Sequence, residues 1–211
     1  MSTKNVTILG GAFDPVHLDH VRVAEVCLQK KLGDEIWFVP SPNRWDKQLI
    51  APTEDRFAML RLAVKGHPQI VLSDFEINMG DFRGSYVSMC SLREAFPECN
   101  FRLLVGADSY AGIPHWRDPL HFFGTEFNGE SLMKEFELIV FSRRGYAVPS
   151  VEEHLEKGFA MLHLVGKADG FEGKYSSTEI RRSLLKRPHV RPEGLLPEVY
   201  AYISDRGLYS A

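Results

Sequence analysis

Six short apolar runs, separated by segments with helical spacing, limit the folds open to this chain. The runs cover residues 6–9, 36–39, 70–72, 101–105, 138–141 and 161–165. Most are continuously apolar, which is typical of strands buried on both faces of a parallel sheet. Helical spacing follows over 16–31, 53–65 and 85–96, with Thr53 as a candidate helix cap. The alternation predicts an α/β fold with a doubly wound, mostly parallel sheet, which binds ligands at the carboxyl ends of its strands.

Composition excludes several classes of protein. The 211 residues carry a net charge of −3, which argues against broad nucleic-acid binding. Three cysteines, Cys27, Cys90 and Cys99, do not form a disulfide framework and favour reduced thiols in a cytoplasmic protein. The short apolar run near the N-terminus does not fit a signal peptide, and no stretch is long enough to predict a membrane span.

The C-terminal segment has a different character from the alternating part. Two helical patterns, in "YSSTEIRRSLLKR" and "LLPEVYAYISDRGLY", are joined by a linker bounded by Pro188 and Pro192. Pro197 suits a first helical turn and Gly207 a helix end. We therefore expect a nucleotide-binding type of α/β domain over 1–174 and a small helical subdomain over 175–211 that covers the edge of the sheet.

The first candidate functional motif is "GGAFDPVHLDH", residues 10–20. It follows an apolar strand, and we expect the chain to turn on Gly10 and Gly11 and to enter a helix near Pro15 or Val16. Helix N-termini attract anions, and His17 and His20 at i and i+3 would face the same crevice. Imidazoles there can stabilise charge on a phosphoryl group. The alternatives are surface or capping histidines, or a metal pair, although no nearby Cys or third His completes a ligand set.

The second motif is "YSSTEIR", residues 175–181. Ser176 and Glu179 have the spacing of a capping box, so a helix should begin here. The hydroxyls of Ser177 and Thr178 and the guanidinium of Arg181 would add to a second anion site. The alternative is a well-capped helix with its arginines in solvent. Two anion sites on one chain suggest a ligand with several phosphates, such as a nucleoside triphosphate.

Both motifs resemble signatures of one enzyme superfamily, the HxGH nucleotidyltransferases. Its patterns are G-G-[ST]-F-D-P-x-H-x-G-H and I-S-S-T-x-I-R. Three further segments, "VGADSYAGIPHWRD", "FELIVFSRRGY" and "LLPEVYAYISDRGLY", are similar in order to segments of the nicotinate and nicotinamide mononucleotide adenylyltransferases. The likeness covers nearly the whole chain, so the chain is identified as a member of that family with a Rossmann-like nucleotidyltransferase fold.

The resemblance implies a reaction and its substrates. The 5′-phosphate of a pyridine mononucleotide would attack the α-phosphorus of ATP, releasing pyrophosphate and forming NAD or its deamido form in NAD biosynthesis. Mg²⁺ would accompany the ATP phosphates, and no covalent enzyme intermediate is expected. The implied partners are ATP and the mononucleotide, with neither nucleic acid nor membrane; a homo-oligomeric state is left open.

The resemblance also implies site residues. The implied catalytic residues are His17, His20, Lys47 and Arg181. The implied ATP-binding residues are Gly10, Gly11, Ala12, Phe13, His17, His20, Gly106, Asp108, Ser176, Ser177, Thr178 and Arg181. The implied mononucleotide-binding residues are Lys47, Tyr86, Trp116 and Arg144, with Trp116 stacked on the pyridine ring. No metal ligand is implied in the protein itself.

The chain departs from the family patterns at several positions. Asp19 replaces the glycine of H-x-G-H, and a carboxylate there would repel phosphate unless it turns away or pairs with a cation. Ala12 replaces Ser or Thr in the glycine turn. The segment "PSPNRWDKQ" keeps Lys47 but lacks the family's Pro-His, and "SYV" replaces S-Y-T. The choice between acid and amide substrate therefore stays open, with the acid favoured by the bacterial character of the C-terminal half.

Three other functions compete with this interpretation. One is another small-molecule nucleotidyltransferase, similar to the phosphopantetheine adenylyltransferases. Another is a nucleotide-sensing protein on the same fold whose catalysis is lost because of Asp19. The third is an RNA-binding module, which the acidic charge disfavours. Residues 40–52 and 122–135 are candidate lids that order on ligand binding.

Overall fold

A computed structural model describes residues 3–44, 48–118, 124 and 127–210. Its centre is a six-stranded sheet in the order β3-β2-β1-β4-β5-β6, and every neighbouring pair is parallel. The strands are β1 (Lys4–Gly11), β2 (Glu35–Pro40), β3 (Ile70–Leu72), β4 (Cys99–Gly106), β5 (Glu137–Phe141) and β6 (Leu162–Val165). The doubly wound α/β fold predicted from the sequence is confirmed, and each strand lies within two residues of its predicted bounds.

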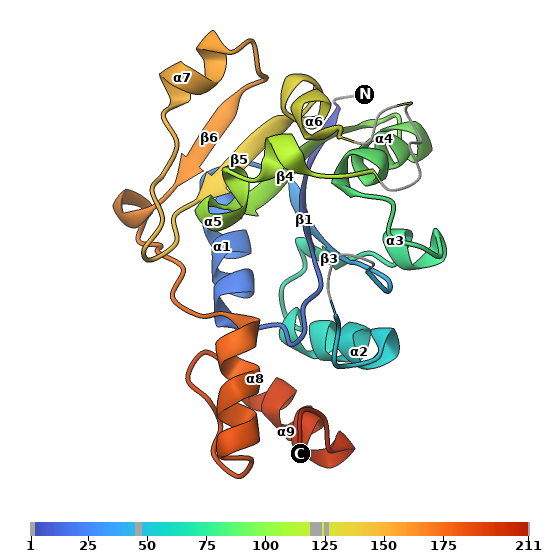
Figure 1. Ribbon diagram of the computed structural model, residues 1–211, viewed down its shortest axis with the longest axis vertical. Helices are drawn as coiled ribbons and strands as arrows, with labels where there is room; N and C mark the ends of the chain where they lie inside the picture. Colours follow the sequence, from blue (N-terminus) through green and yellow to red (C-terminus); the bar gives the residue numbers. More distant parts are fainter. Residues whose placement is uncertain (1–2, 45–47, 119–123, 125–126, 211) are drawn as a thin grey trace.

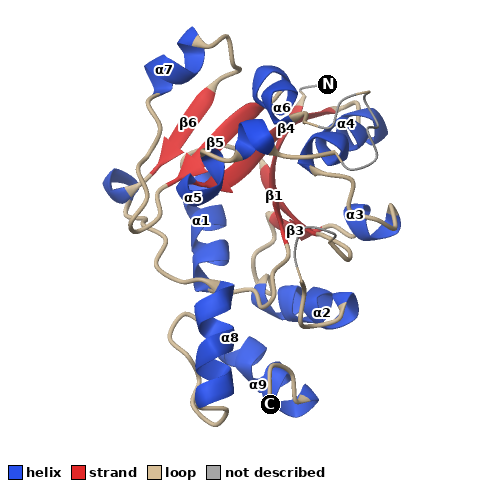
Figure 2. Ribbon diagram, viewed as in Figure 1, coloured by secondary structure: helices blue, strands red, loops and turns tan. Residues whose placement is uncertain are grey.

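Helices cover both faces of the sheet (Figures 1 and 2). The longer ones are α1 (Leu18–Gln29), α2 (Thr53–Ala63), α4 (Ser85–Ala95), α6 (Gly129–Glu135), α8 (Ser177–Lys186) and α9 (Pro197–Arg206). The shorter ones are α3 (Phe75–Asn78), α5 (Ala107–Tyr110), α7 (Val151–Glu156) and the 3₁₀ turns η1 (Ile113–His115) and η2 (Lys167–Asp169). None of the described helices is both long enough and apolar enough to span a membrane.

Alternating side chains of the strands build two hydrophobic cores. Leu104 and Ile139 point to the face covered by α1 and α2, whereas Leu103 and Leu138 point to the face covered by α4 and α6. Because both faces are covered, the central parts of the strands are mostly apolar on both sides, with Thr7 and Arg102 as exceptions. This explains the continuous apolar runs from which the fold is predicted.

The C-terminal helices belong to the core on the α1 and α2 face. Ile180 of α8 and Ile203 of α9 are buried in that core, and α9 packs beside α2 (Figure 1). The expectation that this segment covers the edge of the sheet is therefore wrong. The apolar sides of α8 and α9 extend the core on the α1 and α2 face, and α9 packs against α2. Pro197 begins α9 and Gly207 ends it in the left-handed conformation, as predicted. The division into 1–174 and 175–211 stays a prediction.

Two local predictions, one about a turn and one about a helix cap, are also wrong. Gly10 and Gly11 do not form the turn, because both are paired with Val39 and Pro40 as the last residues of β1. The chain turns just beyond them, where Phe13 has a φ of 49°, and α1 begins only at Leu18. Thr53 does not cap α2: Pro52 is the N-cap residue, and the Thr53 hydroxyl accepts a hydrogen bond from Arg56 instead.

Helix α6 packs into a core, whereas the sequence makes 122–135 a candidate lid. Leu132 and Met133 of this helix are buried in the α4 and α6 core. A helix that contributes to the core cannot move as a lid without exposing apolar surface. A lid within 122–135 is thus excluded for the α6 part, while residues 45–47, 119–123 and 125–126 lie outside the described part of the chain.

A buried arginine anchors the loop that follows β1. Arg56 of α2 is fully buried and donates to the carbonyl oxygens of Ala12 (2.7 Å) and Ser41 (2.8 Å), and to Thr53 Oγ1 (2.9 Å). These bonds supply donors to two loop carbonyls that neither helix nor sheet satisfies. The position of the loop after β1 therefore depends on a side chain more than forty positions away.

We expect Arg56→Met to lower the free energy of unfolding by about 3 kcal/mol, because three acceptors lose a charged donor in the interior. Arg61→Met is the matched control, since Arg61 is an exposed arginine on the same helix. Its effect should stay within about 0.5 kcal/mol. Urea denaturation of both variants measures the difference, and equal losses would contradict the anchoring role of Arg56.

Candidate active site

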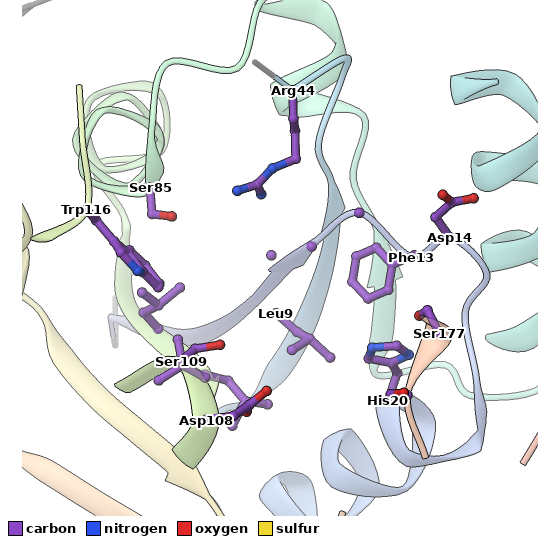
Figure 3. A pocket seen from close by; sticks show the side chains of 18 of the residues that line it. Leu9, Phe13, Asp14, His20, Arg44, Ser85, Asp108, Ser109, Trp116 and Ser177 are labelled. Carbon is purple, nitrogen blue, oxygen red and sulfur yellow. The ribbon is translucent and has the colours of Figure 1, made fainter. Parts of the chain in front are cut away.

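A pocket of about 700 Å³ opens at the carboxyl ends of β1 and β4 (Figure 3). These two strands are neighbours in the sheet but lead to helices on opposite faces, so the chain leaves a crevice between them. Gly10 and Gly11 form its floor on the β1 side, and Gly106 borders it on the β4 side. The pocket lies where the predicted topology places a ligand.

Most of the predicted site residues line this pocket. They are Gly10, Gly11, Ala12, Phe13, His17, His20, Gly106, Asp108, Trp116, Ser176, Ser177 and Thr178. Among the residues that the structure describes, the lining does not include Tyr86, Arg144 or Arg181. Lys47 lies outside the described residues, so its role stays a prediction.

The two histidines form a stacked pair at the start of α1. Their ring centroids are 3.7 Å apart, and the backbone N–H of His17 donates to Nδ1 of His20 (3.1 Å). That bond makes Nδ1 of His20 an acceptor, so a neutral His20 ring carries its proton on Nε2. The pair thus presents at least one fixed N–H donor, in a pocket that also receives the N-terminus of α1.

His17 is the more buried member of the pair. Burial lowers the pKa of His17 well below its ordinary value of 6.5, and the charges of His20 and Arg143 act in the same direction. His17 is therefore neutral at pH 7. Its Nδ1 atom is buried and has no hydrogen-bond partner among the residues that the structure describes. A buried ring nitrogen that lines a pocket without a partner suits a hydrogen bond to a ligand.

The second motif meets the first at this point. Ser176 caps α8 by accepting from the backbone N–H of Glu179 (3.2 Å), as the sequence predicts. Ser177 Oγ donates to the carbonyl oxygen of Pro15 (2.8 Å), and the guanidinium of Arg181 donates to the carbonyl oxygen of Asp14. Hydroxyls from one motif and imidazoles from the other therefore share one pocket (Figure 3).

Asp108 and Arg143 form an ion pair on the β4 side. The distance between Arg143 Nη1 and Asp108 Oδ2 is 3.3 Å, while Asp108 Oδ1 is buried and has no hydrogen-bond partner in the described part of the chain. A Cβ at Gly106 would lie 2.2 Å from Asp108 Oδ1, so a larger residue at this position would displace the Asp108 carboxylate. A carboxylate oxygen without a partner can accept a hydrogen bond from a sugar hydroxyl, which agrees with the ATP-binding role that the resemblance implies for Asp108.

The opposite end of the pocket combines an aromatic ring with charged groups. Figure 3 shows Trp116 and Ser85 on one side, with Arg44 extending from the rim toward the centre. The guanidinium carbon of Arg44 lies 4.1 Å from the centroid of the Phe82 ring. Glu76 also lines this end, and burial raises its pKa to about 7, against the lowering effects of Ser88 and Arg44. This end suits a flat ring with an anionic substituent.

Two residues implied for the mononucleotide lie elsewhere. The Tyr86 side chain is buried against Phe136, and its hydroxyl donates to Glu135. Arg144 is exposed, and its neighbour Arg143 points into the pocket instead. The mononucleotide contacts of Tyr86 and Arg144 stay predictions that this geometry does not favour.

Comparison with known proteins agrees with the motifs. A family model described as cytidylyltransferase-like matches residues 8–183. A protein of Clostridium botulinum named "probable nicotinate-nucleotide adenylyltransferase" is 30% identical over 97% of this chain and 98% of its own length. A protein of the same name from Bordetella avium is 29% identical over 98% of both chains. The chain belongs to the cytidylyltransferase-like family and to its nicotinate-nucleotide adenylyltransferases.

A solved structure agrees with this assignment. The Plasmodium falciparum nicotinic acid mononucleotide adenylyltransferase complexed with NaAD has a TM-score of 0.79 and 25% identity, and the match covers 98% of this chain and 97% of that one. The fold and the family resemblance predicted from the sequence are confirmed. The chain is thus an enzyme of the nucleotidyltransferase class.

Several pocket residues of this adenylyltransferase are not predicted from its sequence. They include Arg44, Glu76, Phe82, Ser85, Arg117 and Arg143. Arg143 could have been found, because it lies two residues beyond β5, where ligand-binding residues of parallel sheets gather. Glu76 and Phe82 carry no such signal, since α3 and the loop after it have no recognisable motif.

The described residues of the adenylyltransferase contain no cluster of three His, Cys, Asp or Glu side chains that could hold a metal ion. Of the pocket carboxylates, Asp14 and Asp108 already face Arg181 and Arg143. A divalent cation in this pocket would therefore need most of its ligands from the substrate.

The buried state of His17 makes stability depend on pH. Below pH 6.5 the unfolded chain binds a proton at His17 that the folded chain does not bind, so the free energy of unfolding falls as the pH falls. Between pH 7.5 and 5.5 we expect His17 to account for about 1 kcal/mol of this loss. The variant His17→Asn should lose correspondingly less stability over the same interval. Urea denaturation at both pH values measures this, and identical losses in both proteins would contradict a neutral, buried His17.

Proposed function

We propose that this chain transfers the adenylyl group of ATP to nicotinate mononucleotide, releasing pyrophosphate and forming deamido-NAD. The observation that carries the proposal is one pocket with phosphate-binding groups at one end and Trp116 with Arg44 at the other. A dinucleotide product would place its phosphates at the first end and its pyridine ring at the second. The Plasmodium falciparum protein with the same fold was solved with NaAD, the deamido dinucleotide.

The reaction needs positioning and charge stabilisation more than covalent chemistry. An oxygen of the mononucleotide 5′-phosphate forms a bond to the α-phosphorus, and the bond from that phosphorus to the bridging oxygen of the β-phosphate breaks. Negative charge increases on the departing pyrophosphate and is spread over the equatorial oxygens of the α-phosphoryl group. Fixed N–H donors aimed at these oxygens lower the barrier, because they need no reorganisation during the reaction.

The histidine pair supplies such donors. His20 presents Nε2–H when neutral, because its Nδ1 accepts from the backbone of His17. If His20 is protonated it becomes a cation beside the neutral His17 ring, and the stacking at 3.7 Å disfavours charge on both rings. We therefore assign α-phosphoryl stabilisation to His20, with His17 as a neutral donor. Ser176, Ser177 and Thr178 would bind the β- and γ-phosphates at the N-terminus of α8.

Arg181 would contribute less directly than its motif implies. Its guanidinium donates to the carbonyl oxygen of Asp14 and lies 3.4 Å from Thr178 Oγ1. In this position it holds α8 against the loop after β1 and adds positive charge near the phosphates. Mg²⁺ is proposed to arrive on the ATP phosphates, because the substrate offers the oxygen ligands that this cation prefers.

The acidic form of the mononucleotide is favoured by charge. Arg44 extends into the pocket on the side of Trp116, and a nicotinate carboxylate gains a charge-assisted hydrogen bond from a guanidinium that a neutral amide does not match. The relatives named above are nicotinate-nucleotide enzymes. We propose Arg44 as the group that distinguishes acid from amide.

The direct test is turnover with ATP, Mg²⁺ and nicotinate mononucleotide, followed by pyrophosphate release. We expect turnover in the wild type and a loss of about a hundredfold in kcat for His20→Ala, as for removal of one donor to a developing charge.

The control for this test is His189→Ala, because His189 is exposed and lies outside the pocket lining of the described residues. It should retain wild-type turnover. Wild-type protein that binds ATP without turnover would favour the nucleotide-sensing alternative, and a loss below tenfold in His20→Ala would remove that residue from the mechanism.

Substrate choice is tested with Arg44→Gln. We expect the KM for nicotinate mononucleotide to rise by about tenfold, since one charge-assisted hydrogen bond is lost, and the KM for nicotinamide mononucleotide to change little. The KM for nicotinamide mononucleotide in the same variant is the control for the KM for nicotinate mononucleotide. An equal rise for both would place Arg44 on their common phosphate instead.

A further inference from the structure

Asp19 stands where the resembling motif has glycine, and its side chain takes an unexpected direction. The residue is buried in the first turn of α1, and it is absent from the pocket lining that the described residues form. Its Oδ2 atom accepts the backbone N–H of Lys174 (2.5 Å) and of Tyr175 (2.8 Å). The carboxylate therefore points at the segment that leads into α8 and away from the phosphate site.

The loop after β5 holds that segment on a second side. The backbone N–H of Gly173 donates to the carbonyl oxygen of Ser142 (2.9 Å), and the N–H of Arg144 donates to Gly173 (3.0 Å). Arg143 Nη2 donates to the carbonyl oxygen of Tyr175 (3.0 Å). Residues 173–175 thus lie between Asp19 and the loop after β5, and Ser176 follows immediately.

We propose that Asp19 is a positioning residue for ATP, which fixes the hydroxyls of Ser176–Thr178 at the distance from His17 and His20 that a triphosphate requires. The proposal rests on the adenylyl transfer proposed above. Asp19 belongs to the same helical turn as His20, and Lys174 precedes Ser176 by two residues. Its two hydrogen bonds therefore fix the chain immediately before Ser176 to the first motif, beside the direct bond from Ser177 to the Pro15 carbonyl.

Chemistry favours a carboxylate for this role. One ionised oxygen accepts two N–H groups strongly, and the bonds offset the negative charge that the glycine pattern avoids. A glycine in place of Asp19 offers no acceptor, so both N–H groups would need water or a new backbone position. The chain thus compensates the negative charge of Asp19 with two backbone N–H donors and uses that contact to position the start of α8.

The experiment compares Asp19→Ala, Asp19→Asn and the control Asp169→Ala. Asp169 also accepts a backbone N–H, from Gly166 (2.9 Å), in the same connection between β6 and α8 but outside the pocket lining of the described residues. The readouts are the Kd for a non-hydrolysable ATP analogue, the KM values for ATP and nicotinate mononucleotide, and hydrogen exchange at the amides of Lys174 and Tyr175.

In Asp19→Ala we expect the analogue Kd and the ATP KM to rise by about tenfold, because misplaced binding groups lose alignment with the triphosphate. The mononucleotide KM should stay within about twofold. Asp19→Asn keeps a neutral acceptor of the same shape, so its rise should be about threefold. Both amides should exchange faster in Asp19→Ala, while Asp169→Ala should leave ATP binding unchanged.

Faster amide exchange with unchanged ATP binding would overturn the proposal, because the bonds would then be only structural. An equal rise for ATP and mononucleotide would overturn it too. If Asp19→Ala does not fold, Asp19→Asn decides, and an unchanged analogue Kd in that variant contradicts the positioning role. Wild-type protein that binds the analogue but has no turnover would count against the adenylyl transfer, while the change in analogue Kd would still test Asp19.

Discussion

A single buried carboxylate ties the distant parts of this molecule together. Asp14 accepts the backbone N–H groups of Ile50 (2.9 Å) and Ala51 (3.1 Å) and the hydroxyl of Tyr209 (2.6 Å), and Arg181 lies 3.8 Å from its Oδ2. The loop after β1, the entry to α2 and the C-terminal helices therefore converge on one charge. Because a buried carboxylate needs hydrogen-bond partners, the contacts from all three parts together satisfy Asp14.

This convergence creates the proposed catalytic geometry. The first motif brings two imidazoles and a helix N-terminus, and the second brings three side-chain hydroxyls and another helix N-terminus. Neither is sufficient for a triphosphate alone, since each offers donors on one side only. Asp14 pairs with Arg181, and Asp19 accepts from the backbone before Ser176, so donors face both carboxylates beside the site proposed for an anion.

The fold was predictable from particular runs of residues. The stretch Ile139–Phe141 is apolar on both faces of its strand because two cores bury it, and that burial is visible as an uninterrupted apolar run. The capped start of α8 at Ser176 and the end of α9 at Gly207 follow from local chemistry that operates within four residues. The turn after β1 was not predictable, because it occurs at Phe13, a residue type with no preference for the left-handed region.

Local sequence was enough to predict the six strands, the longer helices that follow β1 and β2, and the ends of α8 and α9 at Ser176 and Gly207, because these properties depend on neighbours along the chain. It could not settle where a side chain points when its partner is far away in sequence. The side chain of Asp19 points toward Lys174 and Tyr175 because their backbone N–H groups lie there. Arg56 is buried because carbonyl oxygens of two loops accept its hydrogen bonds. Arg143 lines the pocket and Arg144 does not, because of the path that the chain takes after β5. Those outcomes follow from packing in three dimensions, which alone brings an acceptor to a donor more than a hundred residues away.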